Sequence, residues 1–369
     1  MAARMLDMRG KACLTVLGDS PLVAETPTYL LDDEITPTAR MFIRNNGGMP
    51  CLDGDLESWR LRIDGEVERP LDTTLGELKR RYAHVTFRLV LECGGNGRAF
   101  FAPKAKGNAW TVGGVSCAEW TGVRLADVLA TARLKSSAVY TGHYGADPTV
   151  DGRTDVPSLS RGMRIEKALE PHTLIAFALN GEDIPAVHGG PVRLIVPGWP
   201  GSLSAKWLTR IWIRDREHDG PGMGGFSYRL PRTPILPGSE GDPADMAIIE
   251  SMPVRSIFTF PADGTVLPAG TRHLHLRGHA WAGDKEVVSV EISVDRGICW
   301  SKANLHPPAN RYAWQRFTAT VDLAAAGDHE VWCKATDSGG GSQPILARNW
   351  NPQGYGANPV HRLRLFLAS

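Results

Sequence analysis

The sequence RLVLECGGNGR fills residues 88–98 and runs from an apolar stretch directly into a cysteine and a group of glycines. The stretch before Cys93 predicts a strand, and the glycines after it would let the backbone approach a bulky group closely. The charge of Arg98 is expected to make the Cys93 thiol easier to ionise, and the thiolate is the form that binds metals. A soft thiolate suits a thiophilic or high-valent metal better than calcium or magnesium. The alternative, from these residues alone, is a structural cysteine beside a tight turn.

A second cluster of basic side chains surrounds another predicted strand, residues 192–196. His188 and Arg193 lie close to this strand, and Lys206 follows the loop PGWPGS at residues 197–202. Arg offers a planar fork of donors and Lys a point charge, so this cluster could hold a phosphate or another anion. A solvated charged edge is the commoner fate of such residues. The bulky Trp and Pro side chains around them argue against simple solvation.

Other motifs exclude several protein classes. The glycines lack the spacing of a Walker phosphate loop, and neither a Gly-x-Ser-x-Gly elbow nor a His-Glu-x-x-His helix occurs. None of the six cysteines forms a Cys-x-x-Cys pair, which disfavours zinc ribbons, thioredoxin motifs and covalent c-type haem. The three histidines in residues 273–279 are expected to be core or surface residues. Cys299 and Cys333 could form a disulfide; the favoured interpretation is two buried thiols on neighbouring strands.

Two domains are predicted, because 369 residues can build two cores and the pattern changes near Pro253. Residues 1–250 mix helical and strand signals with long Gly/Pro-rich loops, and a capping box at Thr74 opens a short helix. Residues 251–369 alternate as strand, turn, strand, which suits an antiparallel β-sandwich of immunoglobulin type. The fold class is therefore α+β. The Gly/Pro-rich segment from Asp215 to Asp245 is either a linker or an active-site loop.

The individual elements follow from the spacing of apolar residues. Helical spacing is predicted at residues 123–129, and strands are predicted at residues 273–278, 288–294, 317–321, 330–335 and 362–367.

Charge and hydropathy point away from nucleic acids and membranes as main partners. Lys and Arg number 41 against 40 Asp and Glu, a formal net charge of +1. No apolar run is long enough to cross a bilayer. The start, MAARMLD at residues 1–7, lacks the apolar stretch of an export signal. The protein is therefore either cytoplasmic or a form from which a leader has been removed.

The order of the motifs resembles that of the sulfite oxidase family over nearly the whole chain. The segment from Cys93 to Arg98 resembles the one that supplies the metal thiolate in that family. Any one motif is weak, whereas seven in the same order are highly specific. The resembling stretches are residues 42–46 (FIRNN), 93–98 (CGGNGR), 118–125 (AEWTGVRL), 180–182 (NGE), 188–193 (HGGPVR), 197–207 (PGWPGSLSAKW) and 349–354 (NWNPQG).

The resemblance implies molybdenum bound by one molybdopterin (a pyranopterin dithiolene), with Cys93 as the only protein ligand of the metal. It implies a mixed α/β molybdopterin-binding domain at 1–250, an immunoglobulin-like dimerisation domain at 251–369, and hence a homodimer. Matched position by position, the cofactor contacts are Asn46, Cys93, His188, Arg193, Ser204 and Lys206. The pocket for a small oxyanion is Arg44, Arg98, Lys106, Trp110, Tyr228 and Gln353, of which Arg44, Arg98 and Tyr228 are the expected catalytic residues.

Two positions depart from the pattern of the animal enzyme. Asn46 stands where that enzyme has His, which affects cofactor contacts more than the type of reaction. Gln353 stands where sulfite-oxidising members usually carry a third substrate arginine, which removes one positive charge from the pocket. Eukaryotic nitrate reductases also lack this arginine.

The reaction implied by the resemblance is oxidation of sulfite to sulfate, after which two electrons must leave one at a time. The chain has neither a haem-attachment motif nor a b5 domain, so an external acceptor such as a c-type cytochrome is expected. Haem-free members are typically bacterial and exported, so a periplasmic location is expected. Two alternatives stay open. One is a molybdenum reductase of a sulfoxide, nitrate or a related oxo compound, and the other is a binding module that works through its β-sandwich beside a degenerate cofactor domain.

Overall fold

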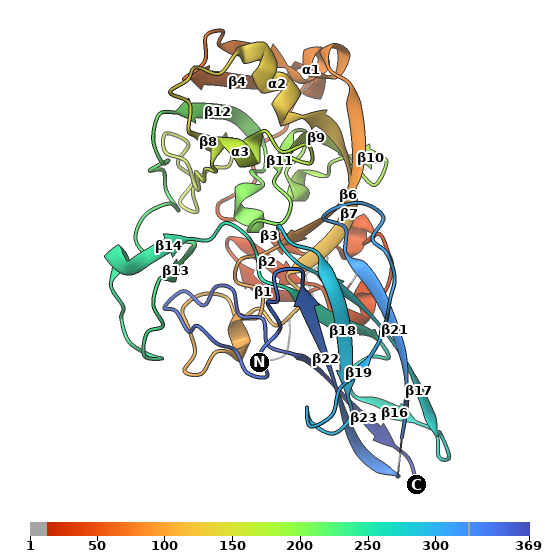
Figure 1. The fold of residues 1–369 in the computed structure, drawn as a ribbon. Helices are drawn as coiled ribbons and strands as arrows, with labels where there is room; N and C mark the ends of the chain where they lie inside the picture. The colour runs from red at the N-terminus through yellow and green to blue at the C-terminus, as the bar shows by residue number, and fades with distance from the viewer. Residues whose placement is uncertain (1–12, 324) are drawn as a thin grey trace.

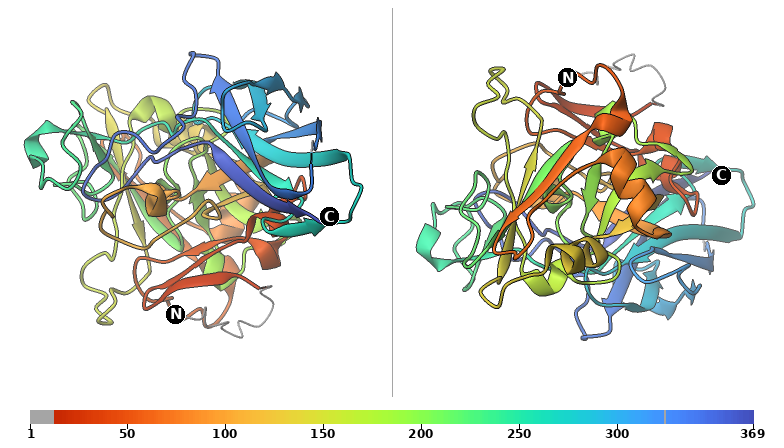
Figure 2. Two further views of the ribbon diagram at one scale, coloured as in Figure 1. Left: turned by 90° about the horizontal axis from the view of Figure 1, so that it is seen from below. Right: turned by 90° about the horizontal axis from the view of Figure 1, so that it is seen from above.

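The computed structural model describes residues 13–323 and 325–369, and its two parts lie one above the other in Figure 1. The upper part holds the three α-helices and the strands up to β14, and the lower part holds strands β15 to β23. Both views in Figure 2 show the C-terminal strands gathered on one side of the molecule. The expectation about an export signal in residues 1–7 falls outside the described residues.

A five-stranded sheet carries the cysteine segment. Its strands pair in the order β10-β9-β7-β6, with β11 also pairing with β9, and every pair is antiparallel. The strand predicted before Cys93 is confirmed, because β6 ends at the residue before it, and the strand predicted at 192–196 is β11. The strands are β6 (His84–Glu92), β7 (Val115–Arg124), β9 (Leu174–Leu179), β10 (Glu182–Asp183) and β11 (Arg193–Ile195).

A four-stranded sheet packs with the helices above it. The order is β5-β4-β12-β8, with β12 parallel to β4 and the other pairs antiparallel. The predicted capping box is confirmed: Thr74 accepts a hydrogen bond from the Glu77 backbone, and the Glu77 carboxylate accepts one from the Thr74 backbone. The elements are β4 (Arg60–Gly65), β5 (Leu71–Thr74), β8 (Tyr140–Gly145), β12 (Leu208–Arg214), α1 (Leu75–Arg81), α2 (Leu125–Ala132) and α3 (Ile165–Ala168).

Two small sheets complete the upper part. A three-stranded sheet near the N-terminus ends in β3, which carries Arg44. A two-stranded sheet has its first strand inside the long Gly/Pro-rich segment and its second strand directly after it. Their strands are β1 (Thr15–Asp19), β2 (Leu22–Glu25), β3 (Ile43–Arg44), β13 (Arg229–Pro231) and β14 (Met246–Ile248).

The lower part is a sandwich of two sheets, in the orders β15-β17-β21-β20 and β16-β23-β22-β18-β19. Their inward side chains form one apolar core, as the alternating pattern predicted. All pairs are antiparallel except β16 with β23, which are parallel. The strands are β15 (Arg255–Phe260), β16 (Thr265–Leu267), β17 (His273–Trp281), β18 (Val287–Ser293), β19 (Ser301–Lys302), β20 (Asn304–Leu305), β21 (Gln315–Asp322), β22 (Gly327–Asp337) and β23 (His361–Leu367).

The cysteine prediction for this part is half right. Cys299 and Cys333 are both free thiols, and Cys333 is buried in the core. Cys299 is exposed, so the expectation of two buried thiols is wrong for this residue. Its position explains the error, because Cys299 lies in the turn between β18 and β19, where its backbone amide donates to the Asp295 carboxylate.

A buried ion pair joins the two parts directly behind the cysteine. Glu92 and Arg255 are both 2% exposed in their side chains, and their oxygen and nitrogen lie 2.5 Å apart. Trp281 of β17 donates to the other Glu92 oxygen at 2.8 Å. Arg255 also donates to the Asn96 carbonyl at 2.7 Å. The segment after β6 is therefore held from behind by the first strands of the sandwich.

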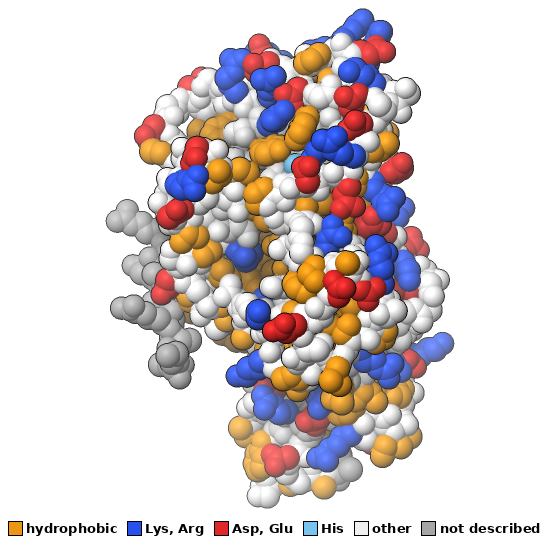
Figure 3. All heavy atoms as spheres, turned by 90° about the vertical axis from the view of Figure 1, so that its left-hand side faces the viewer, with side chains coloured by type: hydrophobic (Ala, Val, Ile, Leu, Met, Phe, Trp, Pro, Cys, Tyr) orange, Lys and Arg blue, Asp and Glu red, His pale blue; other side chains and the backbone are white. Residues whose placement is uncertain are grey.

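The surface agrees with the near-neutral sequence. Figure 3 shows a face on which Lys and Arg side chains are interspersed with Asp and Glu. Among the described residues, no helix combines the length and apolar character needed to span a bilayer. Within the same residues, no group of three or more His, Cys, Asp or Glu side chains is arranged to hold a metal ion.

Candidate active site

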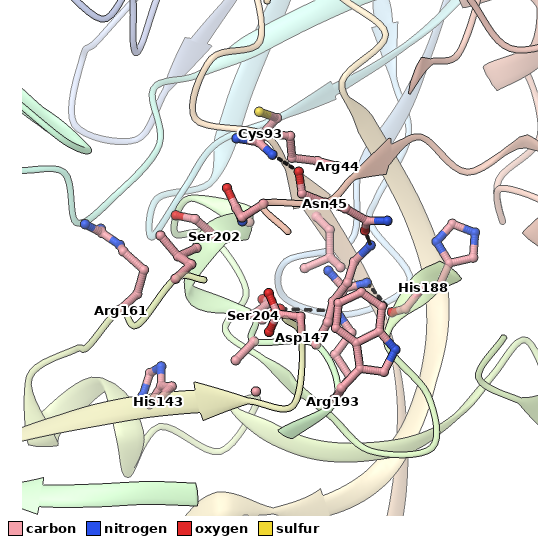
Figure 4. A pocket seen from close by; sticks show the side chains of 18 of the residues that line it. Arg44, Asn45, Cys93, His143, Asp147, Arg161, His188, Arg193, Ser202 and Ser204 are labelled. Atoms are coloured by element: carbon pink, nitrogen blue, oxygen red, sulfur yellow. Dashed lines mark hydrogen bonds between the residues drawn. The ribbon is translucent and has the colours of Figure 1, made fainter. Parts of the chain in front are cut away.

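A cavity of about 850 Å³, including the open space at its mouth, lies between β3, the end of β6, β8 and the loop after β11. Figure 4 shows Cys93 and Arg44 together at one end, and His188 and Arg193 toward the other. Eight of the predicted site residues line it: Arg44, Asn46, Cys93, His188, Arg193, Ser204, Lys206 and Tyr228.

The backbone around Cys93 is fixed by local hydrogen bonds. The Cys93 amide donates to the Gly114 carbonyl at 2.8 Å, and the Asn96 side chain links the Glu92 carboxylate to the Gly114 amide. Gly97 has a φ of +85°, and a Cβ there would lie 2.4 Å from the Ala357 carbonyl oxygen. Only glycine fits this position, which explains one of the glycines that follow the cysteine.

Burial raises the pKa of the Cys93 thiol, although the charges of Arg44 and Arg98 act in the opposite direction. The expectation that Arg98 makes the thiol easier to ionise is therefore wrong for the side chain on its own, because desolvation of the thiolate outweighs the nearby charge. A metal that binds the sulfur would supply the missing driving force for deprotonation.

The opposite end of the cavity is a basic site built from one short stretch of sequence. Arg193 is 6% exposed and donates to the carbonyls of His188 and Ser204 at 2.8 and 3.2 Å. Burial lowers its pKa to about 9. Lys206 donates to the Asn45 side chain at 2.5 Å and to the Val187 carbonyl at 2.6 Å. Arg193 is buried and Lys206 is half-buried, and the hydrogen bonds of both go to neutral oxygens, so this end suits an anion such as a phosphate.

Four side chains form a stack beside the cysteine. The Arg98 guanidinium lies 5.4 Å from the centre of the Tyr355 ring, which stacks on Tyr228 at 5.0 Å, and the Arg161 guanidinium lies 4.5 Å from the centre of the Tyr228 ring. Tyr228 belongs to the segment from Asp215 to Asp245 and lines the cavity, so this segment is an active-site loop rather than a linker. Its φ of +51° is unusual for a residue with a side chain.

Comparison with known proteins assigns the chain to a family. Residues 46–221 match the family described as "Oxidoreductase molybdopterin binding domain", and residues 246–367 match "Mo-co oxidoreductase dimerisation domain". The sulfite oxidase of Gallus gallus is 33% identical over 361 residues, which cover 95% of this chain and 77% of that protein. This chain belongs to the sulfite oxidase family of molybdenum enzymes.

Two further relatives show the range of this molybdenum family. A nitrate reductase [NADPH] of Aspergillus niger is 31% identical over 82% of this chain, which spans 36% of that protein. The solved structure of the sulfane dehydrogenase SoxCD from Paracoccus pantotrophus matches with a TM-score of 0.78 and 26% identity, covering 98% of this chain and 87% of that one. These matches confirm the α+β fold class, and they make the protein a molybdenum oxidoreductase rather than a binding module.

The cavity fits the family's cofactor, molybdenum with molybdopterin. Three buried polar atoms in its wall have no hydrogen-bond partner among the described residues: the Ser202 Oγ and the Nε and Nη2 of Arg161. Buried donors of this kind are normally satisfied, so they indicate space reserved for a polar ligand. A single thiol at one end and a basic cluster at the other match a metal-bearing dithiolene and its phosphate.

The other four predicted residues of this molybdenum enzyme do not line the cavity. Arg98 is 9% exposed and donates to the Gln353 and Asn108 carbonyls at 2.7 and 2.9 Å, so the backbone rather than the side chain of Gln353 meets it. Trp110 is fully buried and packs edge-on against Phe42, which does line the cavity. Lys106 is exposed.

Five residues at this molybdenum site were not predicted from the sequence: His143, Asp147, Arg161 and Ser202 in the cavity wall, and Tyr355 in the stack. Burial raises the pKa of Asp147. Ser202 lies inside the family motif at 197–207, and Tyr355 directly follows the motif at 349–354, so both could have been identified from the sequence. The other three lie in stretches without a recognisable motif.

Proposed function

We propose that this enzyme oxidises sulfite to sulfate at a molybdenum–molybdopterin centre and passes the electrons to an external one-electron acceptor such as a c-type cytochrome. The observation that carries the proposal is one cavity lined by a lone thiol, Cys93, by Arg44 and Tyr228, and by an anion-binding end at Arg193 and Lys206. The chicken relative is named a sulfite oxidase, which supports the choice of substrate.

In this proposal Cys93 is the only protein ligand of the metal, and Asn46, His188, Arg193, Ser204 and Lys206 hold the pterin and its phosphate. When bound, the cofactor supplies the two-electron chemistry of oxygen-atom transfer. Its phosphate would replace the missing counter-ion of the buried Arg193 guanidinium.

Arg44 and Tyr228 would meet the substrate, because both line the cavity, Arg44 beside Cys93 and Tyr228 against the neighbouring Gly94. Arg44 neutralises and orients the anion through charge-assisted hydrogen bonds. The Tyr228 hydroxyl donates a hydrogen bond to the substrate and moves protons during reoxidation. Arg98 acts from behind: its charge favours the Cys93 thiolate, and it supports the ring of Tyr355.

A test combines metal analysis with an acceptor assay. Protein from native expression should hold about one molybdenum and one pterin per chain, and sulfite should drive reduction of ferricyanide and cytochrome c. Enzyme that is loaded with metal yet inert toward sulfite with both acceptors would contradict the proposal.

A second candidate is reduction of nitrate or a sulfoxide. It is favoured by Gln353 at the position of the usual substrate arginine and by the match to a nitrate reductase. Dithionite-reduced enzyme reoxidised by one of these compounds, together with no sulfite turnover, would support this candidate over the first.

We further propose that the enzyme is a homodimer in the periplasm. Its two domains would comprise residues 1–250 and 251–369, and the second domain would form the dimer contact. The match of residues 246–367 to a dimerisation family supports the dimer. Light scattering of the purified enzyme at twice the 40.1 kDa chain mass would agree with it, and a monomer at micromolar concentration would not.

A further inference from the structure

We propose that Arg161 binds the substrate oxyanion and supplies the third positive charge that Gln353 does not provide. This inference rests on the proposed function, because it takes the substrate to be a small oxyanion. It concerns a residue that no motif in the sequence singled out.

Arg161 is held firmly in the cavity wall. Its carbonyl accepts a hydrogen bond from the His143 amide of β8 at 2.8 Å, and its Nη1 donates to the Gly222 carbonyl at 2.6 Å. The face of its guanidinium lies against the ring of Tyr228. In Figure 4 it stands across the cavity from His188, away from the basic end that we assign to the phosphate.

The remaining donors of Arg161 form a fork. Nε and Nη2 lie on the same edge of a guanidinium, and this edge matches two oxygens of one planar or tetrahedral anion. Both atoms are buried and neither has a partner among the described residues. An oxyanion bound at this edge, next to Tyr228, would satisfy both donors at once.

Within residues 13–323 and 325–369, the charge of Arg161 also has no carboxylate partner. The residue is 1% exposed, and the hydrogen bond of its guanidinium goes to the neutral Gly222 carbonyl. The largest electrostatic influences on its pKa come from three tyrosines (Tyr140, Tyr228 and Tyr355) and another cation, Arg229, and His143 and His218 also interact with it. Burial lowers its pKa to about 10, so it stays charged at neutral pH. A buried cation is costly unless an anion accompanies it.

The basic end of the cavity contrasts with this arrangement. There, Arg193 and Lys206 already donate to two protein oxygens each. The unpaired fork lies instead beside Tyr228, the proposed substrate-binding tyrosine. This neighbour favours the substrate, rather than the pterin, as the ligand of Arg161.

The test uses the molybdenum-loaded enzyme with Arg161→Gln and Arg161→Lys. Arg164→Gln is the matched control, because Arg164 is three residues away and exposed, with its ion pair to Glu250 on the surface. Arg161→Gln should raise KM for sulfite roughly 10- to 100-fold and leave kcat within about threefold. Arg161→Lys keeps the charge, loses the fork and should fall between Arg161→Gln and wild type. Arg164→Gln should match wild type.

A second measurement is independent of turnover. Sulfate is titrated into the oxidised loaded enzyme by calorimetry, where the pterin already fills the phosphate end. Its Kd should rise in Arg161→Gln by a factor similar to that for KM. Molybdenum and pterin content should stay at the wild-type level in all three variants.

The outcomes separate the two proposals. A wild type that does not oxidise sulfite, but whose sulfate binding weakens in Arg161→Gln, would remove the proposed reaction and keep this inference. If the wild type oxidises sulfite but KM and the sulfate Kd are unchanged in Arg161→Gln, the proposed reaction would stand and the inference about Arg161 would be overturned. A fall in kcat alone would make Arg161 a positioning residue for Tyr228, and loss of pterin would make it a cofactor contact; either result would overturn the inference.

Discussion

The basic end of the cavity and the thiol end differ in how far their polar groups are already paired. At the basic end, Arg193 and Lys206 are satisfied by oxygens of the protein. On the other side, Arg161 and Ser202 keep donors without partners among the described residues. The protein itself therefore supplies hydrogen-bond partners at the basic end before anything binds, whereas donors at the thiol end need a ligand as their partner.

The two ends also differ in origin along the chain. The basic end comes mainly from residues 188–206, which form one strand and its flanking loops. The thiol end gathers Arg44, Cys93, Arg161 and Tyr228 from four separate segments, with the sandwich supporting it from behind. Substitutions at the thiol end should therefore change catalysis or global stability, and substitutions at the basic end should change cofactor retention.

The largest expected effect is at the thiol. Cys93→Ser should lower sulfite turnover by more than the roughly 100-fold that loss of an outer partner of a metal ligand costs, because the soft ligand itself is lost. The melting temperature should stay near that of wild type, since the segment is held by backbone hydrogen bonds. Full activity of this variant would refute the metal assignment.

The support behind the thiol should be the next most sensitive feature. Arg255→Met leaves the Glu92 carboxylate buried without its counter-ion and should cost about 3–5 kcal/mol in unfolding free energy. Urea unfolding measures this loss. The matched control is Arg277→Met, which breaks a partly exposed ion pair with Asp32 between the same two parts and should cost about 1 kcal/mol or less. Equal losses in the two variants would contradict the special role of the buried pair.

At the basic end, Arg193→Met should weaken pterin retention by roughly 10- to 100-fold, because it removes charge-assisted hydrogen bonds. KM for sulfite, measured on the molecules that keep their cofactor, should be unchanged. Pterin fluorescence after acid release, compared with molybdenum content, gives the occupancy. If KM for sulfite rises while pterin occupancy stays complete, the basic end would take part in substrate binding and not only in cofactor retention.

A last prediction concerns pH. Burial lowers the pKa of His143 to about 3 and that of His218 to about 4, from an ordinary 6.5. Between pH 6.5 and 4 the unfolded chain therefore binds more protons than the folded one, so stability is full above pH 6.5 and falls as the pH drops. The slope is about 1.4 kcal/mol per pH unit for each histidine.

Urea unfolding at pH 7, 6 and 5 checks this slope. His143→Gln should make the decline shallower by the contribution of one histidine, and the exposed His275→Gln should leave it unchanged. An identical decline in wild type and His143→Gln would contradict the assignment of a buried neutral imidazole.

The elements that the sequence predicted share one property: each is decided by residues close together in the chain. The capping box at Thr74, the alternating strands of the sandwich and the strand before Cys93 depend on local spacing and apolar pattern. The basic cluster of 188–206 was found for the same reason. Cys299 shows the limit, because exposure in a turn between strands is decided by the loop and not by the alternation.

The amino-acid sequence alone determined the α+β class, the cysteine segment and the basic cluster, because local pattern and motif order carry that information. Only the tertiary structure decided that Arg161 lies over the Tyr228 ring and that Arg98 donates to the backbone of residue 353. It also decided that desolvation, rather than the nearby arginines, has the largest effect on the pKa of the Cys93 thiol. Burial and unpaired donors are properties of packing between distant segments, and no spacing within a single segment encodes them.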